Sequence, residues 1–322
     1  MSNESKNIKE IENEKKYLSR FSVFFNSEKL SSTYKPVFLK SLIPVSFYDK
    51  DSLQRLMGQQ WITTNEKEMK IDLNFIALRY IRFYWELYSK FKLRQSHSPQ
   101  DANINKILQN VIADSKVPTL QALVGQNYSI LRSDVIKNSI KREVLIHLDN
   151  KKELYEYTSR ENFITINYSL VRFFTKYRDI LIPGLNYTIT RYLEKINFAP
   201  RIAEKVSGYI PRSYLTDEEK RIILELNNKC FYCKEKPGIC MDHVIPFNFI
   251  YQTEVFNMVP ACQECNSVKN DTLPTQELFE LVKGRNSKLL LRQDYTDDWY
   301  QKLYDNCATN YQGHRPYFSP YN

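Results

Sequence analysis

The chain has 322 residues and a mass of 38.4 kDa, with 42% hydrophobic and 26% charged residues, a composition typical of a soluble protein of one or two domains. Its formal charge of +9 favours a polyanionic partner, such as nucleic acid or an anionic membrane surface. The sequence has no apolar run of about 18 residues and no apolar N-terminal segment, so we expect no transmembrane helix, no secretory signal and a cytoplasmic location. Only 7 glycines are present, which disfavours hairpin-rich β architectures and favours long helices.

The first two thirds of the chain are predicted to form a mostly helical domain, residues 1–213. A polar segment over residues 1–20 precedes it as a mobile or helical lead-in. The clearest helix is predicted over residues 72–93, because its apolar residues recur with the helical period. These residues are Leu73, Ile76, Ala77, Tyr80, Tyr84, Leu87, Tyr88 and Phe91. Further helices are expected at 32–42, 102–114, 129–147 and 163–180. The Ser, Pro and Gly content of residues 94–101 and 181–187 predicts loops.

A basic and aromatic segment lies between residues 163 and 213. It contains eight Lys and Arg residues against three acids, with five tyrosines interleaved. Such side chains can hold phosphates and stack on bases, although a solvated helix face with core aromatics would have the same composition. The candidate nucleic-acid contacts here are Arg172, Lys176, Arg191, Lys195 and Arg201.

A domain boundary is predicted near residues 211–216. Thr216 and Glu219 have the spacing of a capping box, which predicts a short helix reaching about Asn227. Another helix is expected at 275–283 and a last one from Thr296. We therefore divide the rest of the chain into a domain at 214–285 and a C-terminal helix with an irregular tail at 286–322. The expected fold class is mostly α, with a helical N-terminal domain followed by a small second domain.

All six cysteines lie beyond residue 229, and four of them form two C-x2-C pairs. Cys230 and Cys233 form the first pair, and Cys262 and Cys265 the second. Two such pairs complete a tetrahedral zinc site, and four thiolates leave no open position for catalysis, so this zinc should be structural. Cys240 and Cys307 fall outside the pairs and are expected to be plain buried thiols.

The segment inserted between and after the pairs carries a second set of polar residues. Asp242 and His243 are adjacent, Asn257 follows, and Asn266 and Lys269 come directly after the last cysteine pair. An imidazole can act as a general base, and Asp and Asn oxygens are hard ligands suited to Mg²⁺ or Mn²⁺. Adjacent side chains on a strand point to opposite faces, so both can reach one site only at a strand end or bulge.

The order Cys-x2-Cys, Asp-His-x-x-Pro, Asn-x-Val-Pro-x-Cys-x2-Cys-Asn-x-x-Lys resembles the HNH (ββα-metal) endonucleases in their zinc-stapled, four-cysteine form. The resemblance covers about 60 residues, from the helix at 216 to the turn at Pro274. It implies a small HNH nuclease domain stapled by zinc, in which His243 is the general base and Asp242 and Asn266 hold a catalytic Mg²⁺ or Mn²⁺. By the same resemblance, Asn257 ties the loop and orients the base, while Lys269 contacts a phosphate. A simpler interpretation of His243 is a histidine packed beside the zinc, or a further zinc ligand.

The leading hypothesis is a metal-dependent HNH endonuclease acting on nucleic acid, with DNA favoured over RNA. By analogy, chains with this layout look like bacterial restriction or anti-phage effectors, whose N-terminal domain selects the substrate. One alternative is an effector that cleaves RNA, for example tRNA. Another is a zinc-ribbon module that binds nucleic acid without catalysis. A homodimer or an activating partner protein is compatible with the sequence. His97, His147 and His314 have no comparable motif around them.

Overall fold

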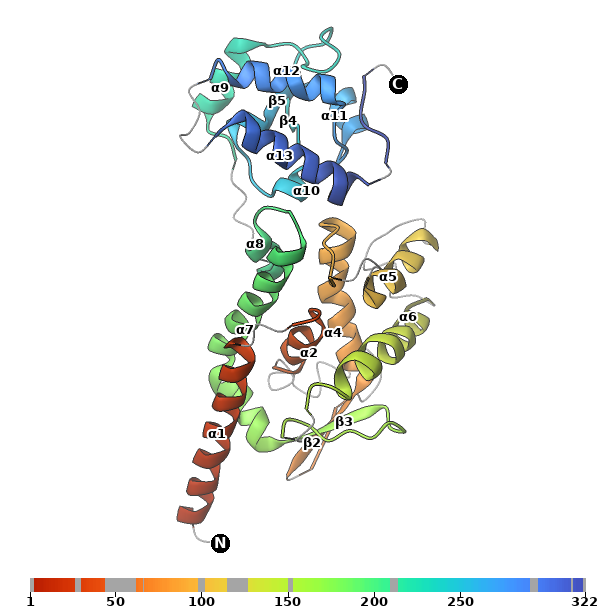
Figure 1. Ribbon diagram of the computed structural model, residues 1–322, viewed down its shortest axis with the longest axis vertical. Coiled ribbons are helices and arrows are strands. Elements are labelled where there is room, and N and C mark those ends of the chain that lie inside the picture. The colour runs from red at the N-terminus through yellow and green to blue at the C-terminus, as the bar shows by residue number, and fades with distance from the viewer. Residues whose placement is uncertain are drawn as a thin grey trace. The chain divides into compact units, whose positions relative to one another are not determined.

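The computed structural model describes residues 3–26, 30–43, 62–65, 67–97, 102–114, 127–149, 153–208, 214–289, 295–313 and 315–320 (Figure 1). Its contacts divide the chain into two compact units. The first unit consists of Met1–Lys90 and Arg94–Ile196, and the second of Phe91–Leu93 and Asn197–Asn322. Both are built mainly from helices, which confirms the mostly α fold class. None of the described helices combines the length and the apolar character that crossing a membrane requires.

The helices of the first unit include the one that apolar periodicity predicts over residues 72–93. They are α1 (Asn3–Asn26), α2 (Tyr34–Leu42), α4 (Leu73–Trp85) with its π-helical continuation η2 (Glu86–Lys90), α5 (Asn103–Asp114), α6 (Asn127–Val135) with its π-helical continuation η4 (Ile136–Leu145), and α7 (Tyr168–Ile196). Helix α4 begins at an Asp72 cap, whose carboxylate accepts a hydrogen bond of 2.7 Å from the Asn74 backbone. Its predicted apolar face is buried.

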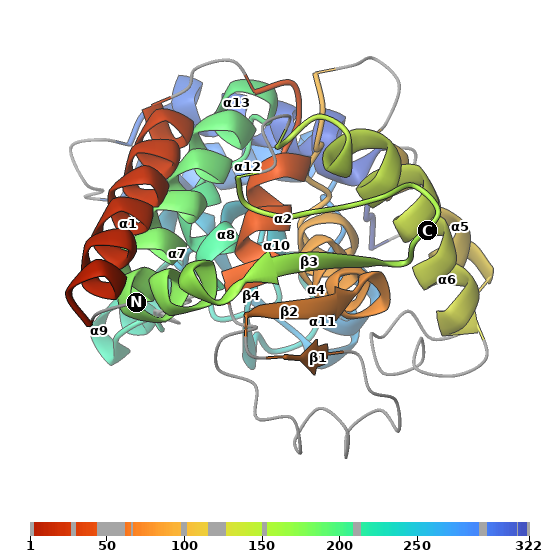
Figure 2. The ribbon, with the colours of Figure 1, turned by 90° about the horizontal axis from the view of Figure 1, so that it is seen from below.

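A three-stranded antiparallel sheet lies in the same unit, and its third strand corrects the helix predicted at 163–180. The strands are β1 (Ile62–Thr64), β2 (Glu68–Asp72) and β3 (Phe163–Asn167), in that order (Figure 2). In β3, Ile164 and Ile166 are buried while their neighbours are partly or fully exposed. This alternation has a period of two and uses β-branched residues, so it suits a strand that buries one face.

Helix α7 continues through residues 181–187, where the sequence predicted a loop. Pro183 and Gly184 are both inside this helix. The glycine is explained by packing, because a Cβ at Gly184 would lie 2.8 Å from Cζ of Phe25 on α1. Helices α1 and α7 lie side by side in both views (Figures 1 and 2). The ring centroids of Phe21 and Phe173 lie 5.8 Å apart between them. Gly184, a residue type that usually destabilises a helix, thus allows α1 and α7 to approach closely.

The second unit has two short strands among short helices. Its elements are α8 (Ile202–Ser207), α9 (Asp217–Leu226), β4 (Cys240–His243), α10 (Phe247–Ile250), the 3₁₀ turn η5 (Val255–Asn257), β5 (Met258–Ala261), α11 (Gln263–Lys269), α12 (Gln276–Asn286), α13 (Asp297–Cys307) and the π-helical turn η6 (Ala308–Gln312). Helix α9 begins with the predicted capping box, in which the Thr216 and Glu219 side chains bond each other's backbone N–H groups. Strands β4 and β5 pair antiparallel, and α11 follows them directly.

The contacts move the domain boundary from the expected residue 213 to residues 196–197. Helix α8 belongs to the second unit because its Lys205 donates a hydrogen bond of 2.5 Å to the Phe249 carbonyl of α10. The expected separate segment 286–322 also belongs to the second unit. Tyr300, Tyr304 and Tyr311 share one hydrophobic core with Cys230 and other residues of the hairpin region.

Two glycines of the second unit provide a matched test of this packing. A Cβ at Gly238 would lie 2.6 Å from the Pro260 ring of β5, whereas a Cβ at Gly284, exposed on α12, meets nothing within 4 Å. We expect Gly238→Ala to lower the free energy of unfolding by about 1–3 kcal/mol through overpacking. Gly284→Ala should raise it by about 0.5–1 kcal/mol, because alanine loses less backbone entropy in a helix. Urea titration followed by circular dichroism measures both, and equal stability of the two variants would contradict this packing.

Candidate functional site

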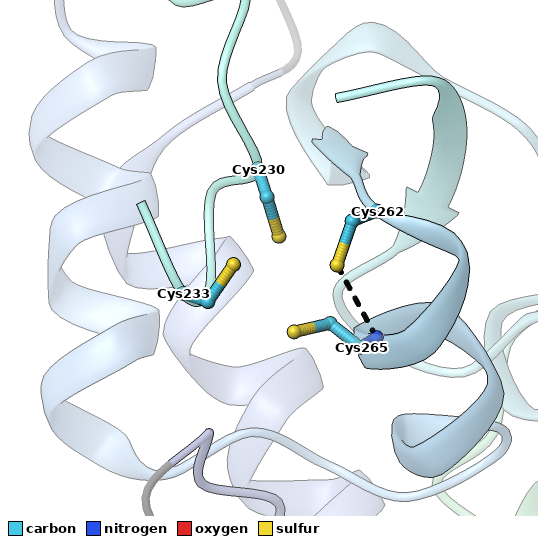
Figure 3. A group of neighbouring side chains, drawn as sticks. All are labelled: Cys230, Cys233, Cys262 and Cys265. Atoms are coloured by element: carbon cyan, nitrogen blue, oxygen red, sulfur yellow. Dashed lines mark hydrogen bonds between the residues drawn. The ribbon is translucent and has the colours of Figure 1, made fainter. Parts of the chain in front are cut away.

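Four cysteines of the second unit converge on one point. Their Sγ atoms all lie within 4.8 Å of one another, and the side chains point toward a common centre (Figure 3). A zinc ion with bonds of about 2.3 Å would separate neighbouring sulfurs by about 3.8 Å, so small adjustments suffice to bind one. All four are free thiols in the structure. The predicted ligands Cys230, Cys233, Cys262 and Cys265 are therefore brought together as a set that could bind a metal such as zinc.

Local backbone geometry places each pair. The first pair lies in a turn closed by a hydrogen bond of 2.9 Å from the Lys234 N–H to the Cys230 carbonyl, and Lys234 adopts a left-handed conformation with φ of 60°. In the second pair, Cys262 caps α11 and its Sγ accepts a hydrogen bond from the Cys265 N–H. The Lys236 N–H lowers the pKa of Cys233 to about 7, whereas burial raises the pKa of Cys230. A bound cation would favour the thiolate form of all four.

The two remaining cysteines lie outside this cluster. Cys307 is completely buried, as expected, but Cys240 is partly exposed, and its Sγ lies 3.4 Å from the Gln263 Oε1 atom. Within the described ranges, no second group of three or more His, Cys, Asp and Glu side chains converges in this way. The donors of the predicted Mg²⁺ or Mn²⁺ site therefore have to be assessed one by one.

Removal of one thiol tests the cluster. We expect the purified protein to contain one zinc ion per chain, and Cys265→Ser to lose it, because three thiolates bind zinc far more weakly than four. The melting temperature of the second unit should fall with the zinc content. Cys240→Ser is the matched control and should keep the metal. Elemental analysis by mass spectrometry measures the content, and full zinc occupancy in Cys265→Ser would exclude the four-cysteine assignment.

The β4–β5 hairpin carries the adjacent Asp242 and His243 at its connected end, where residues 244–257 join the two strands. Asp242 pairs with Val259 and His243 with Met258, and His243 is the last residue of β4. The strand pleat turns the two side chains in different directions, since Asp242 is 7% exposed while His243 is partly exposed. The pair lies at a strand end, but its side chains point in different directions, so their convergence on one site stays a prediction.

The Asp242 carboxylate is held by two donors. Its Oδ2 atom accepts a hydrogen bond of 2.5 Å from the Tyr232 hydroxyl and lies 3.0 Å from the Lys269 ammonium. Lys269 also donates to the His243 carbonyl at 2.6 Å, and its side chain is completely buried. Both partners of the ammonium are groups of the protein itself, and the expected contact between Lys269 and a phosphate stays a prediction that this burial does not support. This lysine extends from α11 into the protein because a buried carboxylate needs a counter-charge there.

The His243 imidazole is enclosed on one side and open on another. Its Nε2 atom lies 3.2 Å from the Thr253 hydroxyl, and its ring centroid lies 5.2 Å from that of Phe247. Burial lowers the pKa of His243 to about 4, so the imidazole is neutral near pH 7 and one ring nitrogen carries a lone pair. It is separate from the cysteine cluster and is not a further zinc ligand there.

Asn257 fixes the segment that follows His243. Its Oδ1 atom accepts hydrogen bonds of 2.8 Å from the Ile245 N–H and from the Tyr300 hydroxyl, while its Nδ2 group donates to the Ile245 carbonyl at 2.9 Å. The side chain is completely buried. Both polar atoms of the amide are bonded within the protein and the side chain is buried, so Asn257 can position the loop after His243 but is not placed to contact a substrate.

Asn266 lies on α11, three residues before Lys269, and the two therefore share one face of that helix. Because Lys269 reaches Asp242, this face is directed toward β4. The Asn266 side chain is partly exposed and has no hydrogen bond among the described residues. Its amide oxygen is thus available to a ligand, in contrast to that of Asn257.

Comparison of the chain with protein-family models, with curated proteins and with solved structures gave no match. The chemistry of the site therefore has to be judged from its own groups. These are a neutral imidazole at a strand end, a buried carboxylate beside it and an available amide on the following helix. Such groups can accept a proton and offer hard oxygen atoms to a cation.

The predicted basic surface is largely neutralised within the protein. Arg172 lies 2.6 Å from a Glu10 carboxylate oxygen and Lys176 lies 2.8 Å from one of Glu14, both acids of α1. Arg201 is paired with Glu204 and belongs to the second unit, whereas the other four residues belong to the first. The local charge of residues 163–213 does not include Glu10 and Glu14, because each lies 162 residues before its basic partner. Arg191 packs on the Tyr187 ring and Lys195 is exposed.

Several residues that hold the site were not predicted. Tyr232 lies between the first two cysteines, where its side chain has only to turn inward to meet Asp242. Tyr300 reaches Asn257 from α13, and Arg285 of α12 donates to the carbonyls of Phe256 and Met258. No local pattern marks Tyr300 and Arg285, because their partners lie 27 to 43 residues away in the sequence.

The buried ion pair is testable by removing one charge. Lys269→Met should lower the free energy of unfolding of the second unit by about 3–5 kcal/mol, because Asp242 would remain buried without a counter-charge. Lys229→Met removes an exposed lysine of the same unit and should change stability by less than about 0.5 kcal/mol. Urea titration provides both values. A loss below about 1 kcal/mol in Lys269→Met would mean that the pair carries little charge in the folded protein.

Proposed function

We propose that this chain is a metal-dependent HNH endonuclease that hydrolyses phosphodiester bonds of nucleic acid, with DNA as the favoured substrate. The observation that carries the proposal is the β4–β5–α11 arrangement. It places His243 at the end of the first strand, ties the next loop to Asn257 and joins the second strand to the helix through Cys262. This order of strand, strand and helix is the one that the sequence resemblance implies.

In this proposal His243 removes a proton from the attacking water. A base must be unprotonated to do so, and burial keeps the pKa of His243 well below neutral pH. The Thr253 hydroxyl and the Phe247 ring hold the imidazole in place, while Asn257 holds the loop behind it. The side chain is therefore oriented before a substrate arrives.

Asp242 and Asn266 fit a hard cation by their donor chemistry. Only one carboxylate oxygen of Asp242 is used by Tyr232 and Lys269, and the Asn266 amide has no partner among the described residues. Two oxygen donors from the protein suit Mg²⁺ or Mn²⁺, which keep several waters and complete their coordination with substrate phosphate. A cation bound there would stabilise the charge that develops on the phosphate and on the leaving oxygen. The cysteine-bound zinc would have a structural role alone.

Cleavage assays test this function. The protein, His243→Ala and the control His147→Ala are incubated with duplex DNA, single-stranded DNA and RNA, in Mg²⁺ or in EDTA. His147 is exposed in the first unit, so its loss should leave cutting unchanged. His243→Ala should cut at least about 100-fold more slowly, because general base catalysis contributes about 10²–10⁴-fold. Its melting temperature should stay close to that of the unmodified protein.

The outcomes separate the remaining hypotheses. Equal cutting by His243→Ala would exclude the assigned base. Cutting of RNA alone would favour the RNA-cleaving effector. Binding of nucleic acid without cutting, in both Mg²⁺ and Mn²⁺, would favour a zinc module that binds but does not catalyse.

A further inference from the structure

A row of aromatic rings in the second unit ends at His243. The ring centroid of Phe91 lies 5.1 Å from that of Tyr251, Tyr251 lies 5.3 Å from Phe247, and Phe247 lies 5.2 Å from the His243 imidazole. These separations are those of direct ring–ring contacts. A displacement of one ring therefore has to be accommodated by the next, because packed side chains leave little free space.

The far end of this row is a residue with an unusual place in the chain. Phe91 is 3% exposed and belongs to the second unit together with Lys92 and Leu93, although the residues on both sides belong to the first unit. It directly follows Lys90, the last residue of η2, which continues the long helix α4. The first ring of the row is thus covalently attached to the end of a helix of the first unit.

Lys205 fixes the same end of the row from a third segment. Its side chain is buried and donates hydrogen bonds to the Phe249 carbonyl at 2.5 Å and to the Pro200 carbonyl at 2.9 Å. Its ammonium also lies 5.6 Å from the Phe91 ring centroid and 5.8 Å from that of Tyr251. A cation placed between two ring faces attracts both.

The backbone at these points is held in strained conformations. Lys92, Arg201 and Tyr251 all have left-handed backbones, with φ of 53°, 55° and 60°. Each lies within the row or beside a segment that holds it. Non-glycine residues keep such conformations only where the surroundings impose them, and they gather at functional sites. Tyr251 has this conformation as the C-cap of α10, where left-handed residues are common, and Arg201 has it as the N-cap of α8.

We propose that the rings of Phe91, Tyr251 and Phe247 position His243, and that the first unit controls the site through Phe91. Movement at the end of η2 would shift Phe91, and the shift would reach the imidazole through the two intervening rings. Phe91 is a positioning residue in this scheme, because it does not touch the reacting groups. The consequence for cutting rests on the proposed nuclease function, whereas the link between Phe91 and the imidazole does not.

Variants of the two end rings test the proposal in the full chain. Phe91→Leu and Phe247→Leu each remove one ring, and Phe247→Tyr keeps the ring. Phe198→Ala removes an aromatic residue of the same unit that is 73% exposed, and serves as the control. The NMR signals of the imidazole rings report the surroundings of each histidine. The chain has only 4 histidines, and the signal that disappears in His243→Ala belongs to His243.

In the ring-removing variants we expect the His243 signals to move while those of the other histidines stay. Turnover should fall about tenfold, less than the roughly 100-fold that a 1 Å misplacement of a reacting group can cost. KM for DNA should change by less than about twofold, because ground-state binding is not involved. Phe247→Tyr should behave as the unmodified protein. Phe247 is only partly buried, so if Phe91→Leu loses the fold, the turnover of the Phe247 pair decides whether the rings position His243, because loss of the neighbouring ring shifts the imidazole signals by itself.

Unchanged His243 signals in both ring-removing variants would overturn the proposal, whatever their activity. If the unmodified protein cuts no substrate, the proposed function fails, but the NMR comparison still decides whether Phe91 reaches the imidazole. If the signals move and the turnover of Phe91→Leu equals that of Phe198→Ala, control of the reaction through Phe91 is excluded.

Discussion

The convergence of four thiols is the constraint on which the second unit depends. It joins the turn at Cys230 to the N-terminus of α11, and α11 follows β5 without a connecting loop. The hairpin is therefore held at its open end, where β5 leads into α11, while His243 lies at the opposite end, where residues 244–257 connect the two strands. Two strands of four residues have too little surface to be stable alone. A metal held by these sulfurs would supply the stability that such a small core lacks.

Around this point, polar groups inside the unit define one arrangement of the site. Lys269 joins α11 to β4 by bonding both Asp242 and the His243 carbonyl. Asn257 joins the start of β5 to the loop after β4, with Tyr300 bonding it from α13. The buried Lys269 ammonium and the Asn257 amide both have partners here, and a misplaced strand would remove them. The polar network therefore favours a single register of the hairpin.

The sequence predicted the parts of this structure that depend on local spacing. Paired cysteines, the capping box at Thr216 and the helical period of 72–93 each lie within one short segment, and all three are confirmed. Predictions that needed long-range information were less successful. The strand at 163–167 required a partner strand about 95 residues earlier, and the direction of Lys269 depended on a buried carboxylate that it had to reach. Likewise, the acids that neutralise Arg172 and Lys176 lie near the N-terminus, in α1.

The placement of α13 limits how far the hairpin can be treated as a portable module. Tyr300 bonds Asn257 and stacks near Phe256 and Phe279, while Tyr304 bonds the Pro274 carbonyl. A fragment ending at residue 285 would keep every motif that the sequence displays but would lack Tyr300 and Tyr304. Its Phe256 and Phe279 rings would be exposed, and the Asn257 amide would have one partner fewer. The smallest autonomous folding unit therefore extends well past the recognisable motif, and transplanting the motif alone into another protein would transfer its ligands without the scaffold that aims them.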